Sequence, residues 1–216
     1  MPLTPRLKQK IAKFDEKGVL FIHIPKSGGR AVSDALYGLQ VKHSSICVYQ
    51  AVVPDLVARV ETVSIVRDPV DRFVSAYRHA ISGGASEKRV SRAFRSTYAG
   101  FRSIGDAIDH VRSARSTYHV GPLFRPQVWY LHDRARRIAV DTLFRYDDLD
   151  SMTPLLSDRF EKPIRRINVT PPTDPIAPNS REKAQIRDLY AADAALYDAL
   201  PIGRIIDLKD GAAGQG

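Results

Sequence analysis

Apolar residues recur along the chain in short runs that alternate between strand-like and helix-like spacing. Residues 19–24 form a nearly continuous apolar run, which is typical of a parallel strand buried on both faces. A helix is predicted over residues 30–37, with one inward face that carries Ala31, Val32, Ala35 and Leu36. Ahead of the strand, Thr4-Pro5 has the form of a helix N-cap, and Gly18 ends the helical spacing. The sequence therefore predicts helix, strand, glycine loop and helix.

Strand followed by helix is predicted twice more along the chain. Residues 62–66 read as a second buried strand, and Asp68-Pro69 predicts the start of a helix with Asp71 in its first turn. The apolar stripe of that helix consists of Val70, Phe73, Val74 and Tyr77. Residues 137–144 predict a third strand, which leads through residues 146–148 into a helix containing Leu155, Leu156 and Phe160. Three strand-to-helix passages favour a parallel sheet with right-handed crossovers.

The C-terminal part of the sequence predicts a loop, one long helix and a tail. Proline and threonine over residues 171–178 exclude regular structure, and Asn179-Ser180 then predicts the cap of a helix carrying Ile186, Leu189, Tyr190 and Leu196. The 216 residues, 44% of them hydrophobic, suffice for one core. We expect a single domain over residues 1–210 and a disordered tail over residues 211–216.

Charge indicates an anionic partner without identifying it. The net charge is +9, and residues 87–137 hold eleven basic residues against four acidic ones. Such a surface attracts nucleotide phosphates, acidic glycans, nucleic acid or anionic lipids. A solvated basic surface that serves solubility is the structural alternative.

Composition also excludes some classes of protein. Cys47 is the only cysteine, so no internal disulfide can form, and no His/Cys/Asp cluster has the spacing of metal ligands. No apolar run approaches the roughly 20 residues that span a bilayer, and the N-terminus lacks the apolar core of a signal peptide. We therefore expect a cytoplasmic protein without a transmembrane segment and without a metal.

The loop after the first predicted strand has the form of an anion-binding turn. Residues 25–30 lie between a buried strand and a helix N-terminus, where backbone N–H groups and the helix dipole favour a phosphate or sulfate. Lys26 precedes Gly28 and Gly29, whereas the ATP/GTP loop places its lysine after the last glycine, so the Walker pattern is absent. A purely structural glycine turn is the alternative.

Residues 21–30, Phe-Ile-His-Ile-Pro-Lys-Ser-Gly-Gly-Arg, resemble the 5′-phosphosulfate loop of carbohydrate-type sulfotransferases that use 3′-phosphoadenosine 5′-phosphosulfate (PAPS). The usual form in that family is Pro-Lys-Thr-Gly-Gly-Thr-Ser. The residues that match directly are Lys26, Gly28 and Gly29, and Ser27 retains the hydroxyl of the threonine. Arg30 and Ala31 depart from the usual Thr-Ser pair, although backbone amides remain there and Arg30 can supply charge. A catalytically inactive relative is therefore one open alternative.

A second candidate site follows the second predicted strand. Arg67 lies at the carboxyl end of that strand, where open α/β sheets bind ligands, and Ser75 lies about two helical turns further on. Helical spacing places Ser75 on one face with Asp71, Arg72 and His79, away from the apolar stripe. Both Arg67 and Ser75 can reach one anion. The structural alternative is that Arg67 pairs with Asp68 or Asp71.

Residues 66–77, Val-Arg-Asp-Pro-Val-Asp-Arg-Phe-Val-Ser-Ala-Tyr, resemble the 3′-phosphate-binding motif of the same family, including the spacing from arginine to serine. The resemblance implies that Arg67 and Ser75 bind the 3′-phosphate of PAPS. Weaker resemblances at residues 124–130, 141–149 and from Asn168 onward extend the similarity over about residues 19–200. They imply that Arg165 and Asn168 belong to a loop that closes over the donor, with helix-end capping as the alternative.

Sulfuryl transfer makes specific demands on the residues of the site. A trigonal group passes in line between two oxygens, and the protein mainly positions the partners and stabilises charge. Lys26 is aimed where negative charge develops on the leaving phosphate. The acceptor hydroxyl needs a general base, for which histidine is suited at neutral pH.

Six histidines compete for the role of base. His43 is the first choice, because it lies between the first helix and the second motif, where related sulfotransferases often place their base. His79 is one turn beyond Ser75 and could serve the donor site or the helix surface. His23 lies in the first strand and is expected to be a hydrogen-bonded core residue. The others, in the basic segment and without recognisable context, are His110, His119 and His132.

These observations predict an α/β, P-loop-NTPase-like three-layer fold whose central parallel sheet is flanked by helices, and a PAPS-dependent sulfotransferase acting on an acceptor hydroxyl. The acceptor expected first is a carbohydrate, with an acidic glycan as one candidate. A nucleotide-dependent phosphoryl transferase is a rival, against which the missing Walker lysine and magnesium ligands argue. A nucleic-acid-binding module that uses residues 87–137 is another, but aromatics do not alternate with basic residues there.

Overall fold

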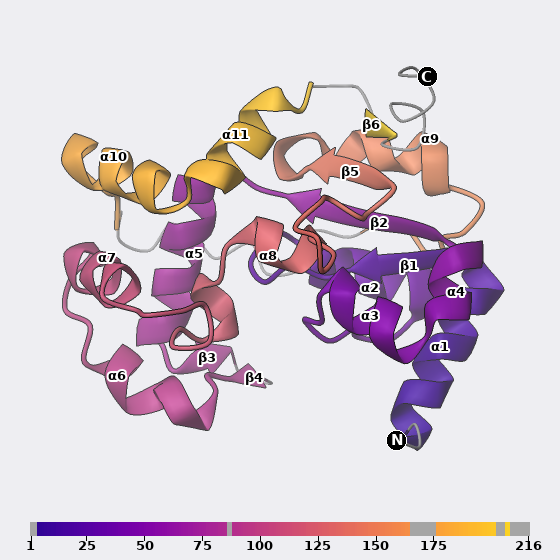
Figure 1. Ribbon diagram of the computed structural model, residues 1–216, viewed down its shortest axis with the longest axis horizontal. Coiled ribbons are helices and arrows are strands. Elements are labelled where there is room, and N and C mark those ends of the chain that lie inside the picture. Colours follow the sequence, from indigo (N-terminus) through magenta and orange to yellow (C-terminus); the bar gives the residue numbers. More distant parts are fainter. Residues whose placement is uncertain (1–3, 86–87, 165–175, 202–205, 208–216) are drawn as a thin grey trace. The chain divides into compact units, whose positions relative to one another are not determined.

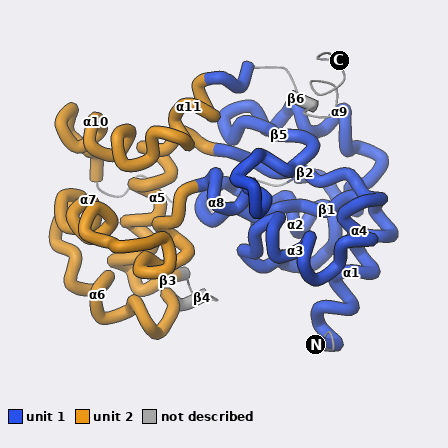
Figure 2. Tube along the Cα trace, in the orientation of Figure 1, with its two compact units in different colours: residues 1–66, 127–169, 199–216 blue, residues 67–126, 170–198 orange. Residues whose placement is uncertain are grey.

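The computed structural model describes residues 4–85, 88–164, 176–201 and 206–207. The predictions for Arg165, Asn168, residues 171–175 and the tail at 211–216 lie outside the described residues. The chain divides into two compact units, residues 1–66, 127–169 and 199–216 forming the first and residues 67–126 and 170–198 the second (Figure 2). The single domain expected over residues 1–210 stays a prediction.

The first unit is built on a sheet with three parallel strands. Its strand order is β1 (Val19–Ile22), β2 (Glu61–Val66), β5 (Thr142–Arg145) and β6 (Ile206–Asp207), and only β6 runs antiparallel to its neighbour (Figure 1). Every residue of β1 is buried, as expected of a strand covered on both faces. The helices of this unit are α1 (Pro5–Lys17), α2 (Gly29–Tyr37), α3 (Ile46–Val52), α4 (Pro54–Arg59), α8 (Gln127–Leu131) and α9 (Met152–Leu156). The predicted α/β class with a parallel sheet flanked by helices is confirmed.

Local signals determine the helix boundaries around β1. The Thr4 hydroxyl accepts a hydrogen bond from the Leu7 amide at the start of α1, and Gly18 ends that helix in the left-handed conformation, with φ of 61°. Phe14 is fully buried against the ring of Tyr37, at 5.0 Å between centroids. The predicted inward face of α2 is likewise buried. Both helices therefore form as the sequence predicts.

The third strand is shorter than predicted. β5 begins at Thr142 instead of Arg137, because residues 133–137 form a tight turn in which the Asp133 carboxylate accepts a hydrogen bond from the Arg137 amide at 2.9 Å. The following 3-10 helix η3 (Tyr146–Ser151) and α9 end at Leu156, so Phe160 is not helical as predicted. The Glu161 amide donates to the Ala35 carbonyl at 2.7 Å, which directs the chain away from the helix axis.

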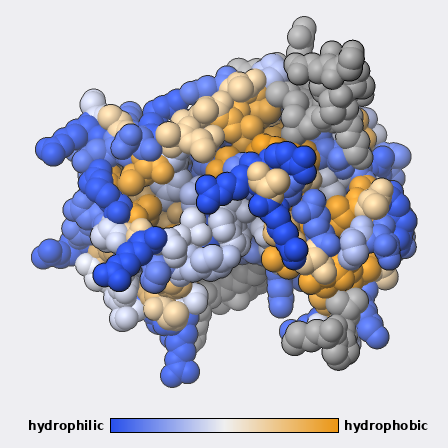
Figure 3. Space-filling view, in the orientation of Figure 1, coloured by the Kyte–Doolittle hydropathy of each residue, from blue (hydrophilic) through white to orange (hydrophobic). Residues whose placement is uncertain are grey.

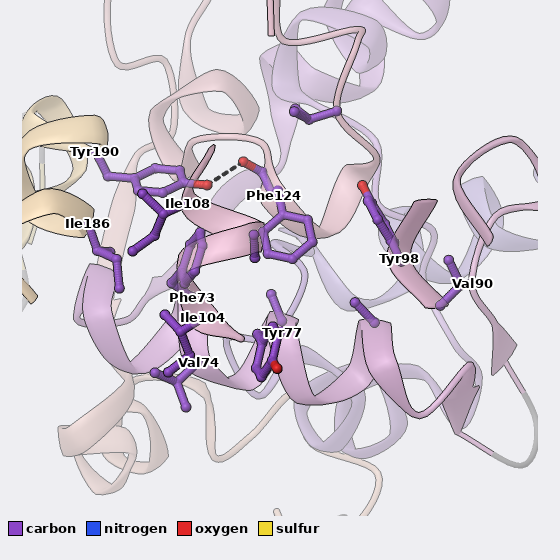
Figure 4. Packing of buried hydrophobic residues seen from close by; sticks show 14 residues of the cluster. Phe73, Val74, Tyr77, Val90, Tyr98, Ile104, Ile108, Phe124, Ile186 and Tyr190 are labelled. Carbon is purple, nitrogen blue, oxygen red and sulfur yellow. Dashed lines mark hydrogen bonds between the residues drawn. The ribbon is translucent and has the colours of Figure 1, made fainter. Parts of the chain in front are cut away.

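The second unit is helical and has its own core. Its longer elements are α5 (Pro69–Ile81), α6 (Arg95–Ala99), α7 (Ile104–Arg112), α10 (Ser180–Leu189) and most of α11 (Ala191–Ala199); short ones are β3 (Gly84–Ala85), β4 (Lys88–Arg89), η1 (Arg92–Phe94) and η2 (Pro122–Phe124). Phe73 packs on Phe124 at 5.3 Å between ring centroids, within the cluster drawn in Figure 4. The predicted stripe of α5 thus faces this core.

The long C-terminal helix that the sequence predicts is two helices. Asn179 and Glu182 form the expected capping box at the start of α10, but Tyr190 leaves the helical conformation, with φ of −117° and ψ of 37°. The buried Tyr190 hydroxyl donates to the Phe124 carbonyl at 2.7 Å (Figure 4). Tyr190 therefore joins the core of the second unit at the point where the helix breaks.

Arg72 is buried, although spacing grouped it with the polar face of α5. Only 1% of it is exposed, and its guanidinium donates to the carbonyls of Leu123 and Arg125 at 3.2 and 2.9 Å. Asp193, also buried, lies 3.8 Å away. Arg72 is therefore a structural residue of the second unit.

None of the helices in the described ranges is long and apolar enough to cross a membrane.

Candidate active site

The loop that joins β1 to α2 presents an open helix N-terminus. Lys26 and Gly28 both have left-handed backbones, with φ of 68° and 75°. Gly28 is the N-cap of α2, and it offers no side chain to the first amides of that helix. Backbone N–H groups at a helix start are partial positive charges that favour an anion. The charge distribution at this turn therefore suits a phosphate or sulfate.

Both glycines of this loop lie against aromatic side chains. A Cβ atom on Gly28 would lie 2.8 Å from Cε2 of Tyr146, and one on Gly29 would lie 2.2 Å from Cδ2 of His23. Neither distance is sterically possible, so the loop needs glycine at both positions. The motif does not reveal these two contacts, because they depend on the directions of the His23 and Tyr146 side chains.

Ser27 is buried and points into the first unit. It is 1% exposed, and its hydroxyl donates to the side-chain oxygen of Gln127 at 3.3 Å. Gln127, at the start of α8, is fully buried. The sequence analysis did not predict that a fully buried glutamine contacts the loop at residues 25–30. Its position within residues 124–130, one of the weaker resemblances noted above, could have indicated it.

His43 contacts the strand that leads into the loop. Its Nδ1 lies 3.0 Å from the His23 carbonyl oxygen, which can only accept a hydrogen bond. Nδ1 therefore carries a proton, and Nε2 is the ring nitrogen that could act as a base. The ring of His43 meets the ring of His23 edge-on at 4.2 Å between centroids. Since His23 in turn packs on Gly29, the structure brings His43 to the side of the loop.

His23 is the core histidine that the sequence predicts. It is 2% exposed, and its Nδ1 lies 3.0 Å from the Val41 carbonyl oxygen. By the same argument, its Nδ1 is the protonated nitrogen. His23 therefore supports both the loop, through Gly29, and the candidate base, through its ring and its carbonyl.

The second motif lies in the second unit, at the start of α5. Arg67 directly follows β2, the parallel neighbour of β1 in the sheet. The Asp68 carboxylate caps α5 by accepting from the amides of Val70 and Asp71 at 2.8 and 3.0 Å, and its other oxygen lies 3.5 Å from Arg187. Ser75 and His79 are half-buried on α5. The predicted placement of both motifs at the carboxyl ends of adjacent strands is therefore present in the topology.

The remaining histidines have other surroundings. His110 packs on Tyr98, at 5.6 Å between ring centroids, and burial lowers its pKa below the ordinary value. The Nδ1 of His119 lies 2.9 Å from the Ser116 hydroxyl, and His132 forms an isolated antiparallel bridge with Ile138. Across the described ranges, no group of three or more His, Cys, Asp and Glu residues could hold a metal ion.

Comparison with known proteins gives one family. The model of the family described as "Sulfotransferase family" matches residues 9–161, more than half of the chain. This range contains both motifs, from Lys26 to Ser75, and it ends beyond β5. No curated protein matches the chain.

Proposed function

The chain belongs to the sulfotransferase family, and we propose that it transfers a sulfuryl group from PAPS to a hydroxyl of a carbohydrate acceptor. Membership makes it a transferase and confirms the predicted P-loop-like fold. The observation that most favours sulfuryl transfer is the loop at residues 25–30, where Lys26 precedes a helix start without a side-chain cap and His23 links Gly29 to His43. The cytoplasmic location expected from the sequence stays a prediction.

The 5′-phosphosulfate is assigned to the amides of Gly28 and Gly29, with Lys26 alongside. The uncapped start of α2 supports this assignment, because anions bind at such ends without further charge. Arg30 is half-buried in the first turn of α2 and adds positive charge there. The hydroxyl of Ser27 donates a hydrogen bond to Gln127, so we propose that Ser27 stabilises the shape of the loop. A direct contact of Ser27 with the donor stays a prediction.

The 3′-phosphate is assigned to Arg67 and Ser75. A guanidinium fork matches the geometry of a phosphate, and charge-assisted hydrogen bonds of this kind are about twice as strong as neutral ones. The position of Arg67 supports the assignment, since it directly follows β2 at the carboxyl end of the strand beside β1. The two residues would distinguish PAPS from donors that lack the 3′-phosphate.

In the transfer step, Nε2 of His43 accepts the proton of the acceptor hydroxyl while that oxygen forms its bond to sulfur. The bond from sulfur to the 5′-phosphate oxygen breaks, and its electron pair becomes negative charge on the leaving phosphate. Lys26 and the loop amides stabilise that charge. The hydrogen bond that Nδ1 donates to the His23 carbonyl supports this role, because it favours the tautomer in which Nε2 is the basic nitrogen.

A transfer assay tests the proposal directly. Wild-type protein is incubated with PAPS and a panel of neutral and acidic oligosaccharides, and with ATP in parallel. We expect a sulfated product from PAPS and no phosphorylated product from ATP. Phosphoryl transfer from ATP would support the kinase-like rival. Salt-sensitive binding of RNA or DNA without any transfer would support the nucleic-acid-binding rival.

A further inference from the structure

A surface pocket of about 500 Å³ lies in the first unit. One wall is α3, with Cys47, Gln50 and Ala51, and the other wall is the turn at residues 133–137. We call it the α3 pocket. The mechanism proposed above uses none of these residues.

The turn that forms one wall is held by its own side chains. The Asp133 carboxylate accepts hydrogen bonds from the amide, Nε and Nη2 of Arg137 at 2.9, 3.1 and 2.9 Å. The Asp133 amide donates back to the Arg137 carbonyl at 2.9 Å. The Arg137 amide, more than any other group, holds the pKa of Asp133 below its ordinary value. Asp133 is therefore ionised and fixes the shape of the turn.

Arg136 adopts a strained conformation in the same turn. Its φ of 59° lies in the left-handed region, which costs a residue with a Cβ on the order of 1 kcal/mol. Among the described residues, the other non-glycine residue with positive φ is Lys26 of the donor loop. Local strain of this kind is concentrated at functional sites.

The pocket wall carries a net positive charge. Arg137 is matched by Asp133, but Arg134, which also lines the pocket, is exposed to solvent and leaves the wall with one excess positive charge. Strongly hydrophilic atoms project from the face of the molecule over the segment between α8 and β5, next to hydrophobic surface (Figure 3). A guanidinium binds the planar carboxylate or the sulfate ester through two parallel hydrogen bonds. The wall therefore suits an anionic group on an otherwise uncharged molecule.

Both walls are connected to the candidate active site. Cys47 lies four residues after His43, so their Cα atoms are at most about 14 Å apart. On the other side, α8 begins at Gln127, which accepts the hydrogen bond of Ser27, and it ends two residues before Asp133. α3 and α8 also pack against each other. The pocket is thus held near the base and the donor loop by elements of one unit.

We propose that the α3 pocket is the subsite for an anionic group, a carboxylate or a sulfate ester, on a sugar that neighbours the one to be sulfated. Arg134 contacts that group, and α3 contacts the sugar ring. The inference rests on the proposed function, because it names the acceptor of the same reaction. It assigns acceptor selectivity to residues outside both family motifs.

The only cysteine of the chain lines the pocket and provides the test. The rate at which N-ethylmaleimide modifies Cys47 is measured with a glucuronate-containing oligosaccharide and with its carboxyl-reduced form, at equal ionic strength. We expect the charged oligosaccharide to slow modification at least threefold and the reduced form to have no effect. Arg134→Ala abolishes the protection. Arg102→Ala, which removes an arginine that is 92% exposed, keeps it.

Three results would overturn the proposal. They are equal protection by the two oligosaccharides, no protection at millimolar concentration, and full protection in Arg134→Ala. Stronger protection by a single-stranded oligonucleotide than by the charged sugar would overturn it in favour of nucleic acid. The labelling needs neither donor nor turnover, so its result is separate from the transfer assay with PAPS. In that assay, Arg134→Ala raises the acceptor KM about tenfold and leaves kcat and donor-product affinity unchanged.

Discussion

Single residues determine the shape of the loop at residues 25–30. Lys26 has a left-handed backbone, and His23 fills the space in which a side chain at position 29 would lie. The sequence predicted that the glycines matter, from their place between a strand and a helix. It could not predict that His23 is the reason at position 29, because the contact follows from the direction of a buried side chain.

Gly29→Ala therefore disrupts the loop. The added Cβ would lie 2.2 Å from Cδ2 of His23, so one of the two must move. We expect at least a tenfold loss of affinity for adenosine 3′,5′-bisphosphate, measured by calorimetry, and partial recovery in the His23→Ala/Gly29→Ala double variant. Gly105→Ala in α7 is the control, since its Cβ meets only the Ser103 hydroxyl at 3.4 Å. Unchanged affinity in Gly29→Ala contradicts the role of the loop.

Lys26→Ala should lower turnover far more than it lowers donor-product affinity. The ammonium group matters most when charge moves onto the leaving oxygen, so its removal raises the transition-state energy more than the ground-state energy. Single-turnover rates and calorimetry on the same variant separate the two effects. A normal rate with collapsed affinity would reduce Lys26 to a binding residue.

His43→Ala and His79→Ala distinguish the two candidate bases. Loss of a general base typically lowers the rate about 10²- to 10⁴-fold with donor binding nearly unchanged, and we expect this of His43→Ala. His79 lies one turn beyond Ser75 on α5, so its loss should affect binding of the donor product instead. Near-normal turnover in His43→Ala would refute the assignment of the base.

At the scale of elements, the sequence predicted correctly the helix starts that depend on contacts within one turn. It failed where a tight turn or a contact between distant residues determines the boundary of an element. Capping residues such as Thr4 and Asn179 act within one turn, and those helix starts are correct. The predicted strand at residues 137–144 failed where Asp133 closes a turn on Arg137, and the long C-terminal helix failed where Tyr190 bonds to Phe124. Tyr190 and Phe124 are distant in sequence, so periodicity along the chain cannot reveal their contact.

The start of the parallel sheet depends on Asp141. Its carboxylate accepts bonds from the amide and the hydroxyl of Thr62, both at 2.8 Å, and thereby joins β2 to the residue before β5. Asp141→Ala leaves the buried Thr62 amide without this partner, which typically costs about 1 to 3 kcal/mol. Urea denaturation should show that loss of unfolding free energy, and Asp158→Ala, at an exposed position, should show almost none. Equal stability of the two variants would contradict the role of Asp141.

At the scale of the whole molecule, the order of the strand-to-helix passages was predictable because each of the two motifs lies within one passage, whereas helices such as α3, α4 and α7 were not predicted. The α3 pocket was not predictable either, because it joins residues near position 50 to residues near position 135. The basic segment over residues 87–137, whose anionic partner the sequence left open, contributes to our proposal only the turn at its C-terminal end. The two motifs can therefore be recognised in the sequence, whereas the pocket depends on long-range contacts.

The most direct test of PAPS as the donor is the calorimetric comparison of adenosine 3′,5′-bisphosphate with AMP. Arg67 and Ser75 are expected to bind the phosphate that only the first compound carries, and loss of a charge-assisted contact typically lowers affinity on the order of tenfold to a hundredfold. We predict at least a tenfold preference for the bisphosphate in the wild type and in Arg102→Ala, and its near-complete loss in Arg67→Ala. Equal affinities of the wild type for the two nucleotides would contradict the assignment of the donor.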